Sequence, residues 1–125
     1  MDNVEPIRTA YDAFAHGGDI DAVMAILAEN VEWHAPQPLA QGIDPRGKEQ
    51  VGKYFERIAA KWEDWALEVD DYVASGNRVC VIGSASGRIH GKHRSYGFVH
   101  VWTLQDGKCS RFDEYVDPDP EQIAI

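Results

Sequence analysis

The chain has 125 residues, of which 44% are hydrophobic, and it carries a formal net charge of −9. This length and composition predict a single globular domain spanning residues 1–125, with enough apolar residues to form a core. The negative charge argues against nucleic-acid binding, which needs clustered Lys and Arg. No run of apolar residues is long enough to span a membrane, so we expect no membrane partner. The N-terminus shows no signal-peptide pattern, so we expect a cytoplasmic protein with Cys80 and Cys109 as free thiols.

The first half of the chain predicts three helices and one strand. Segments 3–18, 19–27 and 48–62 carry apolar residues at helical spacing, and the first of them ends at a pair of glycines. A short strand is expected over residues 30–36, where a proline closes it.

In the second half of the chain, apolar residues no longer follow helical spacing but recur at every second position. Strands are expected over residues 66–74, 78–89, 94–104 and 109–116, and Asp106-Gly107 is a turn signal between the last two. Helices followed by an antiparallel meander predict an α+β fold, in which three N-terminal helices pack on a strongly bent antiparallel sheet. Such a half-open cone either fills its mouth with side chains or leaves a pocket.

The last strand contains an acid where an apolar residue is expected. Glu114 alternates with Phe112 and Val116 on the face that should turn inward. His100 should point inward from the neighbouring strand, so the two side chains are expected to meet. An apolar pocket disfavours the ionised form of a carboxyl group and makes it a better general acid or base near neutral pH. The alternative is a buried pair that only organises the sheet.

Other candidate side chains surround this pair. Tyr11 lies on the apolar face of the first helix and is a candidate donor to a developing oxyanion. Alternation also places Asp71 on an inward face with Leu67 and Val73, as a possible second acid. No metal-ligand spacing is present, so no metal site is expected. Aromatic residues would line a pocket for a flat apolar ligand, or would simply fill the core. The candidate ligand-binding residues are Trp33, Tyr54, Phe55, Trp62, Phe98, Trp102, Phe112 and Val116.

Nearly the whole chain resembles a known family. The stretches that carry the resemblance are "GDIDAVMAILAENVEWHAP", "PRGKEQVGKYFERI", "YVASGNRVCVIG" and "FVHVWTLQDGKCSRFDEYVD". They are similar to the SnoaL-like and ketosteroid-isomerase-like group of the NTF2-like superfamily. The resemblance implies an NTF2-like cone that forms a homodimer through its outer sheet face and needs no cofactor. It does not by itself imply one reaction, because this superfamily contains enzymes and non-catalytic proteins.

The resemblance to ketosteroid isomerases stops at their catalytic base. Those enzymes use a tyrosine on the first helix, a hydrogen-bonding acid on the sheet and an aspartate after the second helix. Tyr11 matches the tyrosine, whereas His100 stands in place of the sheet acid and Ala35 in place of the aspartate. Steroid isomerisation by that mechanism is therefore not expected.

The cyclase and epoxide-hydrolase branches use an acid on the final strand, and Glu114 matches it. The epoxide hydrolases also need an Arg and a second Asp on the neighbouring strand, where this chain has His100 and Trp102. Relatives often have Arg one residue before the Glu, and Asp113 stands there instead. Their full catalytic set is therefore absent.

The sequence thus predicts a protein with a pocket for a small apolar or polycyclic molecule. The first hypothesis is an enzyme doing acid-base chemistry on a polyketide-, steroid- or terpenoid-like compound, as an isomerase, cyclase, dehydratase or hydrolase. Its catalytic residues would be Glu114, His100 and Tyr11. The alternative is a non-catalytic ligand-binding or dimerisation module, and an interaction adaptor with a filled cavity is a third class.

Overall fold

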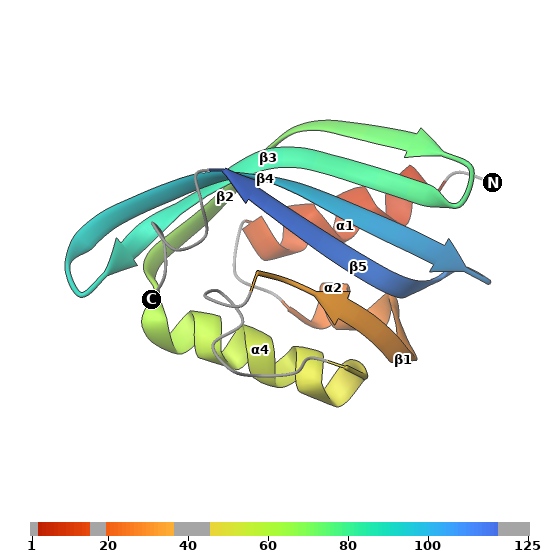
Figure 1. Ribbon diagram of the computed structural model, residues 1–125, viewed down its shortest axis with the longest axis horizontal. Coiled ribbons are helices and arrows are strands. Elements are labelled where there is room, and N and C mark those ends of the chain that lie inside the picture. Colours follow the sequence, from red (N-terminus) through yellow and green to blue (C-terminus); the bar gives the residue numbers. More distant parts are fainter. Residues whose placement is uncertain (1–2, 16–19, 37–45, 118–125) are drawn as a thin grey trace.

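The fold is a bent sheet with helices on one side. The structure, a computed structural model, describes residues 3–15, 20–36 and 46–117. Figure 1 shows α1 and α4 on the same side of the long curved sheet. The α+β cone predicted from the sequence is confirmed. The elements are α1 (Val4–Ala15), α2 (Asp21–Ala25), β1 (Leu27–His34), α4 (Lys48–Lys61), β2 (Glu63–Ser75), β3 (Arg78–Ile89), β4 (Lys92–Gln105) and β5 (Lys108–Asp117).

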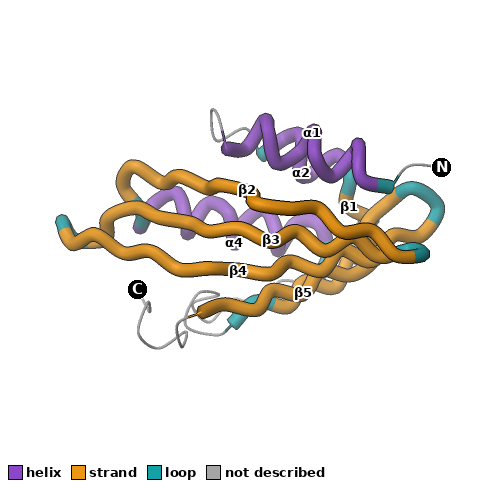
Figure 2. The backbone as a smooth tube through the Cα atoms, turned by 90° about the horizontal axis from the view of Figure 1, so that it is seen from above, coloured by secondary structure: helices purple, strands orange, loops and turns teal. Residues whose placement is uncertain are grey.

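The five strands form one sheet in the order β1-β5-β4-β3-β2. Neighbours from β2 to β5 pair antiparallel, as the meander predicts, and they run side by side in Figure 2. The first strand, β1, pairs with β5 in parallel, so the sheet is mixed. This pairing sets Trp33 opposite Phe112, and their rings stack with centroids 3.8 Å apart.

The second helix is shorter than the periodicity suggests. The sequence predicts a helix over 19–27, but α2 ends at Ala25 and Leu27 already belongs to β1. Leu27 is buried and its backbone pairs with Cys109 on β5, so strand pairing takes residues that apolar spacing assigned to the helix. The predicted glycine stop of the first helix lies outside the described residues.

A bulge in β2 reverses the expected orientation of its second half. The pairing with β3 shifts between Val69 and Asp71. The shift turns Tyr72 inward, where its ring meets Tyr11 edge-on, and leaves Val73 46% exposed. Asp71 is exposed as well, so the expectation of a second inward acid at this position is wrong. An extra residue in one strand flips the faces that strict alternation predicts.

The two long helices cover the inner face of the sheet through their apolar faces. Ile7, Ala10 and Tyr11 of α1 are buried, at the three- and four-residue spacing of one helix face. Val51 and Tyr54 of α4 are buried in the same way. No helix among the described residues is long and apolar enough to cross a membrane.

The backbone of β2 approaches β3 closely at a glycine, Gly83. A Cβ atom at Gly83 would lie 2.2 Å from the Glu68 carbonyl oxygen and 2.9 Å from the ring of Phe98. We expect Gly83→Ala to lower the free energy of unfolding by about 2–3 kcal/mol in urea denaturation, because the backbone must move to admit the methyl group. Gly97→Ala is the matched control on β4, where the added carbon meets its nearest atom at 3.7 Å. Equal effects of the two substitutions would show that the close approach of β2 to Gly83 is not the cause of the destabilisation.

Candidate functional site

A cavity lies between the helices and the inner face of the sheet, and aromatic side chains dominate its lining. The space open to the centre of a water-sized sphere is about 50 Å³, several times the roughly 10–15 Å³ that one water needs. His100, Glu114 and Tyr96 line it from the sheet, and α1 contributes Tyr11. The cavity therefore suits a compact ring system with few polar groups.

Four side chains form a hydrogen-bonded network at one wall of this cavity. His100 and Glu114 are cross-strand partners on β4 and β5, and His100 Nε2 lies 2.7 Å from Glu114 Oε2. The other ring nitrogen, Nδ1, lies 2.5 Å from the Tyr11 hydroxyl. Trp102 Nε1 donates to the same hydroxyl at 2.8 Å. The sequence predicts the inward pair, and the structure adds the link through Tyr11 to Trp102.

Neighbouring side chains restrict the orientation of the His100 ring. It stacks on Phe98 with centroids 4.0 Å apart and an interplanar angle of 14°. Side-chain exposure is 9% for His100 and 7% for Glu114. The stacking on Phe98 and the contacts at both nitrogens restrict the orientation of the imidazole, so it can position the carboxyl group of Glu114.

The network allows few proton arrangements. If the Tyr11 hydroxyl donates to Nδ1, then Nε2 carries the imidazole proton and donates to Glu114 Oε2. If Nδ1 carries the proton instead, it donates to Tyr11 and Nε2 accepts from a protonated Oε2. A doubly protonated imidazole donates at both nitrogens. When the carboxyl group is ionised, its other oxygen, Glu114 Oε1, can only accept a hydrogen bond.

Buried tyrosines surround the carboxyl group and stay neutral. Burial raises the pKa of Tyr11 and of Tyr54 well above the ordinary value, and the charge of Glu114 raises both further. The pKa of Tyr96 is raised by the same two causes. The charge of Glu114 therefore acts on three hydroxyl groups of the lining.

Three buried polar atoms of the lining have no hydrogen-bond partner within the described part of the chain. They are Glu114 Oε1 and the indole nitrogens of Trp33 and Trp65. An unpaired buried polar group costs about 1–3 kcal/mol. All three belong to residues that line the cavity, so the cost falls on this part of the fold.

Comparison with known proteins agrees with this architecture. The SnoaL-like domain family model matches residues 7–112. The chain belongs to this family. No curated protein matches the SnoaL-like domain significantly.

Solved structures similar to this SnoaL-like domain include NTF2-like proteins of two bacteria. The Burkholderia pseudomallei protein is 26% identical with a TM-score of 0.86, over 98% of this chain and 95% of that one. The Burkholderia xenovorans protein is 28% identical with a TM-score of 0.79, over 98% and 94%. TerC, which was co-crystallised with polyporic acid, is 25% identical with a TM-score of 0.80, over 92% and 91%.

The SnoaL-like domain places most of the predicted ligand-binding residues around the cavity. Trp62 and Val116 do not line it. Trp62 ends α4 and packs edge-on against Trp65 at 4.8 Å, while Val116 is half-buried beyond Glu114 on β5. The predicted residues that do line the cavity are Trp33, Tyr54, Phe55, Phe98, Trp102 and Phe112.

The sequence interpretation missed other lining residues of the SnoaL-like domain. Trp65 and Leu67 share the inward face of β2. The alternation of side chains along a strand would have predicted this, had the strand been started at Glu63. Asp64 adopts a left-handed φ of 53° immediately before them. The lining residues that were not predicted are Phe14, Val23, Ile58, Trp65, Leu67 and Tyr96. Among the described residues no three His, Cys, Asp or Glu side chains gather as metal ligands.

Proposed function

We propose that the protein binds a small apolar carbonyl compound in the inner cavity and moves a proton on it, with Glu114 as the base and acid. The observation that carries this proposal is Glu114 Oε1, a buried acceptor without a protein partner on the wall of an apolar cavity. The other carboxyl oxygen, Oε2, is hydrogen-bonded to His100, so Oε1 is the oxygen that would contact a ligand. A general base needs that combination of reach and orientation.

The proposed reaction is a proton transfer next to a carbonyl group. Glu114 Oε1 takes the proton from the carbon beside the carbonyl, and the electron pair of the C–H bond moves to the carbonyl oxygen. The proton then returns from Glu114 to the same carbon or, when a carbon–carbon double bond is conjugated with the enolate, to the far carbon of that conjugated system, which isomerises the compound. His100 and Tyr11 hold the carboxyl group in place and are positioning residues.

Relatives support a ligand in this cavity. TerC was crystallised with polyporic acid, and a protein from Catenulispora acidiphila with a ketosteroid-isomerase-like fold was crystallised with trimethylamine. The apolar lining and the family membership favour a small organic ligand for this chain too. The cytoplasmic location and the absence of nucleic-acid, membrane and cofactor partners stay predictions from the sequence.

The test is deuterium exchange at the acidic carbon of β-tetralone and a panel of small cyclic ketones, followed by proton NMR in heavy water. We expect the wild-type protein to accelerate exchange and Glu114→Gln to slow the protein-dependent rate by at least about 100-fold, the usual size of a general-base contribution. Glu56→Gln, on the exposed face of α4, is the control and should keep the wild-type rate.

The same experiment distinguishes the alternative function. A ketone that binds with unchanged exchange would reject catalysis and leave a binding protein. A rate that Glu114→Gln does not alter would also reject Glu114 as the base.

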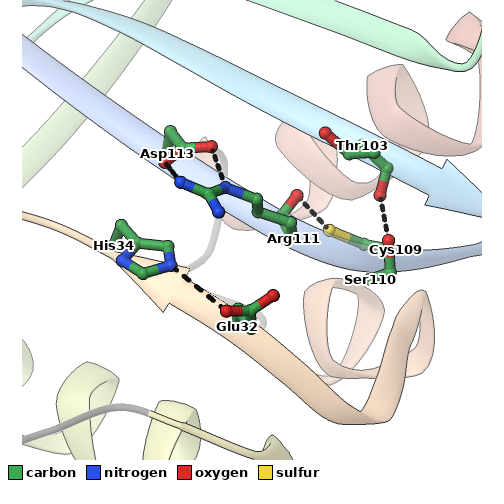
Figure 3. A network of polar contacts seen from close by, with 7 residues as sticks. All are labelled: Glu32, His34, Thr103, Cys109, Ser110, Arg111 and Asp113. Atoms are coloured by element: carbon green, nitrogen blue, oxygen red, sulfur yellow. Dashed lines mark hydrogen bonds and ion pairs between the residues drawn. The ribbon is translucent and has the colours of Figure 1, made fainter.

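We also infer that the outer face of the sheet pairs two copies of the chain. Ile82 and Tyr115 lie on this face and are 38% and 62% exposed, and Val99 lies between them in the strand pairing. Beside this apolar row, Arg111 forms a two-point ion pair with Asp113, shown in Figure 3. An apolar centre with charged groups at its edge is typical of a protein interface.

Charge placed in the apolar row should separate the copies. We expect the double substitution Ile82→Glu and Tyr115→Glu to convert a dimer to a monomer in light scattering coupled to size-exclusion chromatography. Lys53→Glu on α4, away from this face, should leave the mass unchanged. A wild-type protein that is monomeric at high concentration would rule out the interface.

A further inference from the structure

The Tyr11 hydroxyl group lies between an indole nitrogen and an imidazole nitrogen. Its oxygen is 2.8 Å from Trp102 Nε1 and 2.5 Å from His100 Nδ1, and these are the hydrogen-bond partners that the described part of the chain gives it. An indole N–H group can only donate, so Trp102 donates to the Tyr11 oxygen. The hydroxyl hydrogen of Tyr11 is then left with one acceptor, His100 Nδ1.

Tyr11 keeps this hydrogen at neutral pH. Burial raises the pKa of Tyr11 well above the ordinary value and the charge of Glu114 raises it further, although the hydrogen bond from Trp102 lowers it. The Tyr11 ring meets the rings of Tyr72 and Trp102 edge-on. This packing restricts the ring, so the oxygen stays between the two nitrogens.

The charge of His100 depends on the direction of this hydrogen bond. A neutral imidazole with its proton on Nε2 accepts from Tyr11 at Nδ1 and donates to Glu114 Oε2, 2.7 Å away. A doubly protonated imidazole would donate at Nδ1 as well. The Tyr11 oxygen would then receive two donors, and its own buried hydrogen would lack an acceptor. A buried donor without a partner carries a cost equivalent to about 5- to 150-fold in population.

Glu114 acts in the opposite direction, because a carboxylate beside an imidazole favours the protonated ring. Among the described residues, the titratable groups in hydrogen-bond contact with His100 are Glu114 on β5 and Tyr11 on α1. The two phenylalanine rings that contact the imidazole carry no charge. The His100 side chain is 9% exposed, and burial disfavours a charged ring. Burial and the Tyr11–Trp102 pair therefore act together against the single carboxylate.

We propose that Trp102 is a positioning residue that keeps His100 neutral, with its proton on Nε2, by making Tyr11 a donor to Nδ1. The contact between His100 and Glu114 is then a hydrogen bond from a neutral ring and not an ion pair. This inference rests on the proposed function and deepens it, because a carboxylate without a neighbouring positive charge is a stronger base. A proton that Glu114 takes from a ligand stays on the carboxyl group, since neither nitrogen of His100 has a free lone pair.

The wild-type protein tests the state of His100 directly. The histidines are labelled with the heavy isotope of nitrogen, and correlations between ring protons and ring nitrogens are recorded by NMR at neutral pH without any ketone. His100 is identified by the nuclear Overhauser contacts between its ring and the ring of Phe98, which stacks on it. We expect Nδ1 to resonate as an unprotonated nitrogen and Nε2 as a protonated one. Two protonated nitrogens, or the reverse pattern, would overturn the proposal.

Removing the indole N–H group at position 102 tests the role of Trp102. Trp102→Phe removes this group together with one ring, whereas benzothienylalanine at the same position keeps both fused rings and has sulfur in place of the N–H group. In both variants the Tyr11 hydrogen is free to turn away from Nδ1. The ratio of neutral to doubly protonated His100, followed by NMR over a range of pH, should therefore fall by about fivefold or more.

Trp33→Phe is the matched control for these substitutions. The Trp33 ring packs edge-on against Trp102 in the same lining, but its N–H group has no hydrogen-bond partner within the described residues. The control should leave the ratio of neutral to doubly protonated His100 unchanged.

The outcomes separate this inference from the proposed catalysis. A ratio that neither substitution at position 102 changes, or that Trp33→Phe lowers equally, would overturn the role of Trp102. Ketone exchange that depends on Glu114 in a protein whose His100 is doubly protonated would keep the proposed function and reject this inference. A neutral His100 in a protein that exchanges no ketone would reject catalysis and support the inferred direction of the hydrogen bonds.

Discussion

Replacing His100 with leucine should lower the free energy of unfolding by about 3 kcal/mol or more at neutral pH, measured by urea denaturation. The side chains of His100 and Glu114 are 9% and 7% exposed, so bulk solvent is not in place of the lost partner. The substitution would leave Glu114 Oε2 without its 2.7 Å contact and remove one of the two partners of the Tyr11 hydroxyl. A buried carboxyl group without its partner costs far more than the lost packing of the ring.

The double replacement His100→Leu with Glu114→Leu distinguishes this cause from packing. Removing both members of a buried pair is often nearly neutral, so the double variant should be more stable than His100→Leu alone. His93→Leu, at an exposed position on β4, is the control for the substitution itself. Single effects that add within about 0.5 kcal/mol would show that the two residues are not coupled.

The inward pair could be predicted because its signal is local. Phe112 and Val116 mark the buried face of the last strand, and Glu114 between them must share that face. The Asp106-Gly107 turn joins the two strands, and both of its residues have positive φ, as a two-residue hairpin turn requires. The pairing register shifts near Cys109, yet the apolar pattern still identifies the correct face.

The remaining site depends on contacts that no local pattern contains. Tyr11 reaches His100 across 89 positions of sequence, and this contact depends on how α1 packs over the sheet. The parallel pairing of β1 with β5 brings Trp33 into the same cavity. Trp62 and Trp65 lie on the two sides of the junction between α4 and β2, and only the start of β2 at Glu63 decides which one faces the cavity.

Stability should fall steeply once the pH rises above about 10, because three tyrosines are buried with their protons. Burial raises the pKa of Tyr11, Tyr54 and Tyr96, and the charge of Glu114 adds to each shift. In the unfolded chain these hydroxyl groups lose their protons near pH 10. Their stabilising contribution is therefore complete below that pH and is lost above it, as the unfolded state binds fewer protons than the folded state.

The expected slope is roughly 1.4 kcal/mol per pH unit for each tyrosine that keeps its proton in the folded state. Burial also raises the pKa of the Cys109 thiol to about 12 from the model-compound value of 9.0, so some loss should begin near pH 9. Urea denaturation at a series of pH values measures the slope. The part of the near-ultraviolet tyrosinate absorbance that comes from Tyr11, Tyr54 and Tyr96 should appear together with unfolding and not before it.

Tyr54→Phe provides the control for this linkage. The variant lacks one buried hydroxyl group, so its stability should fall less steeply above pH 10, by roughly 1.4 kcal/mol per pH unit. Below pH 9 no tyrosine ionises in either state, and the difference between the two proteins should not depend on pH. Parallel curves above pH 10 would mean that Tyr54 ionises as readily in the folded chain as in the unfolded one, which is incompatible with a hydroxyl group buried beside Glu114.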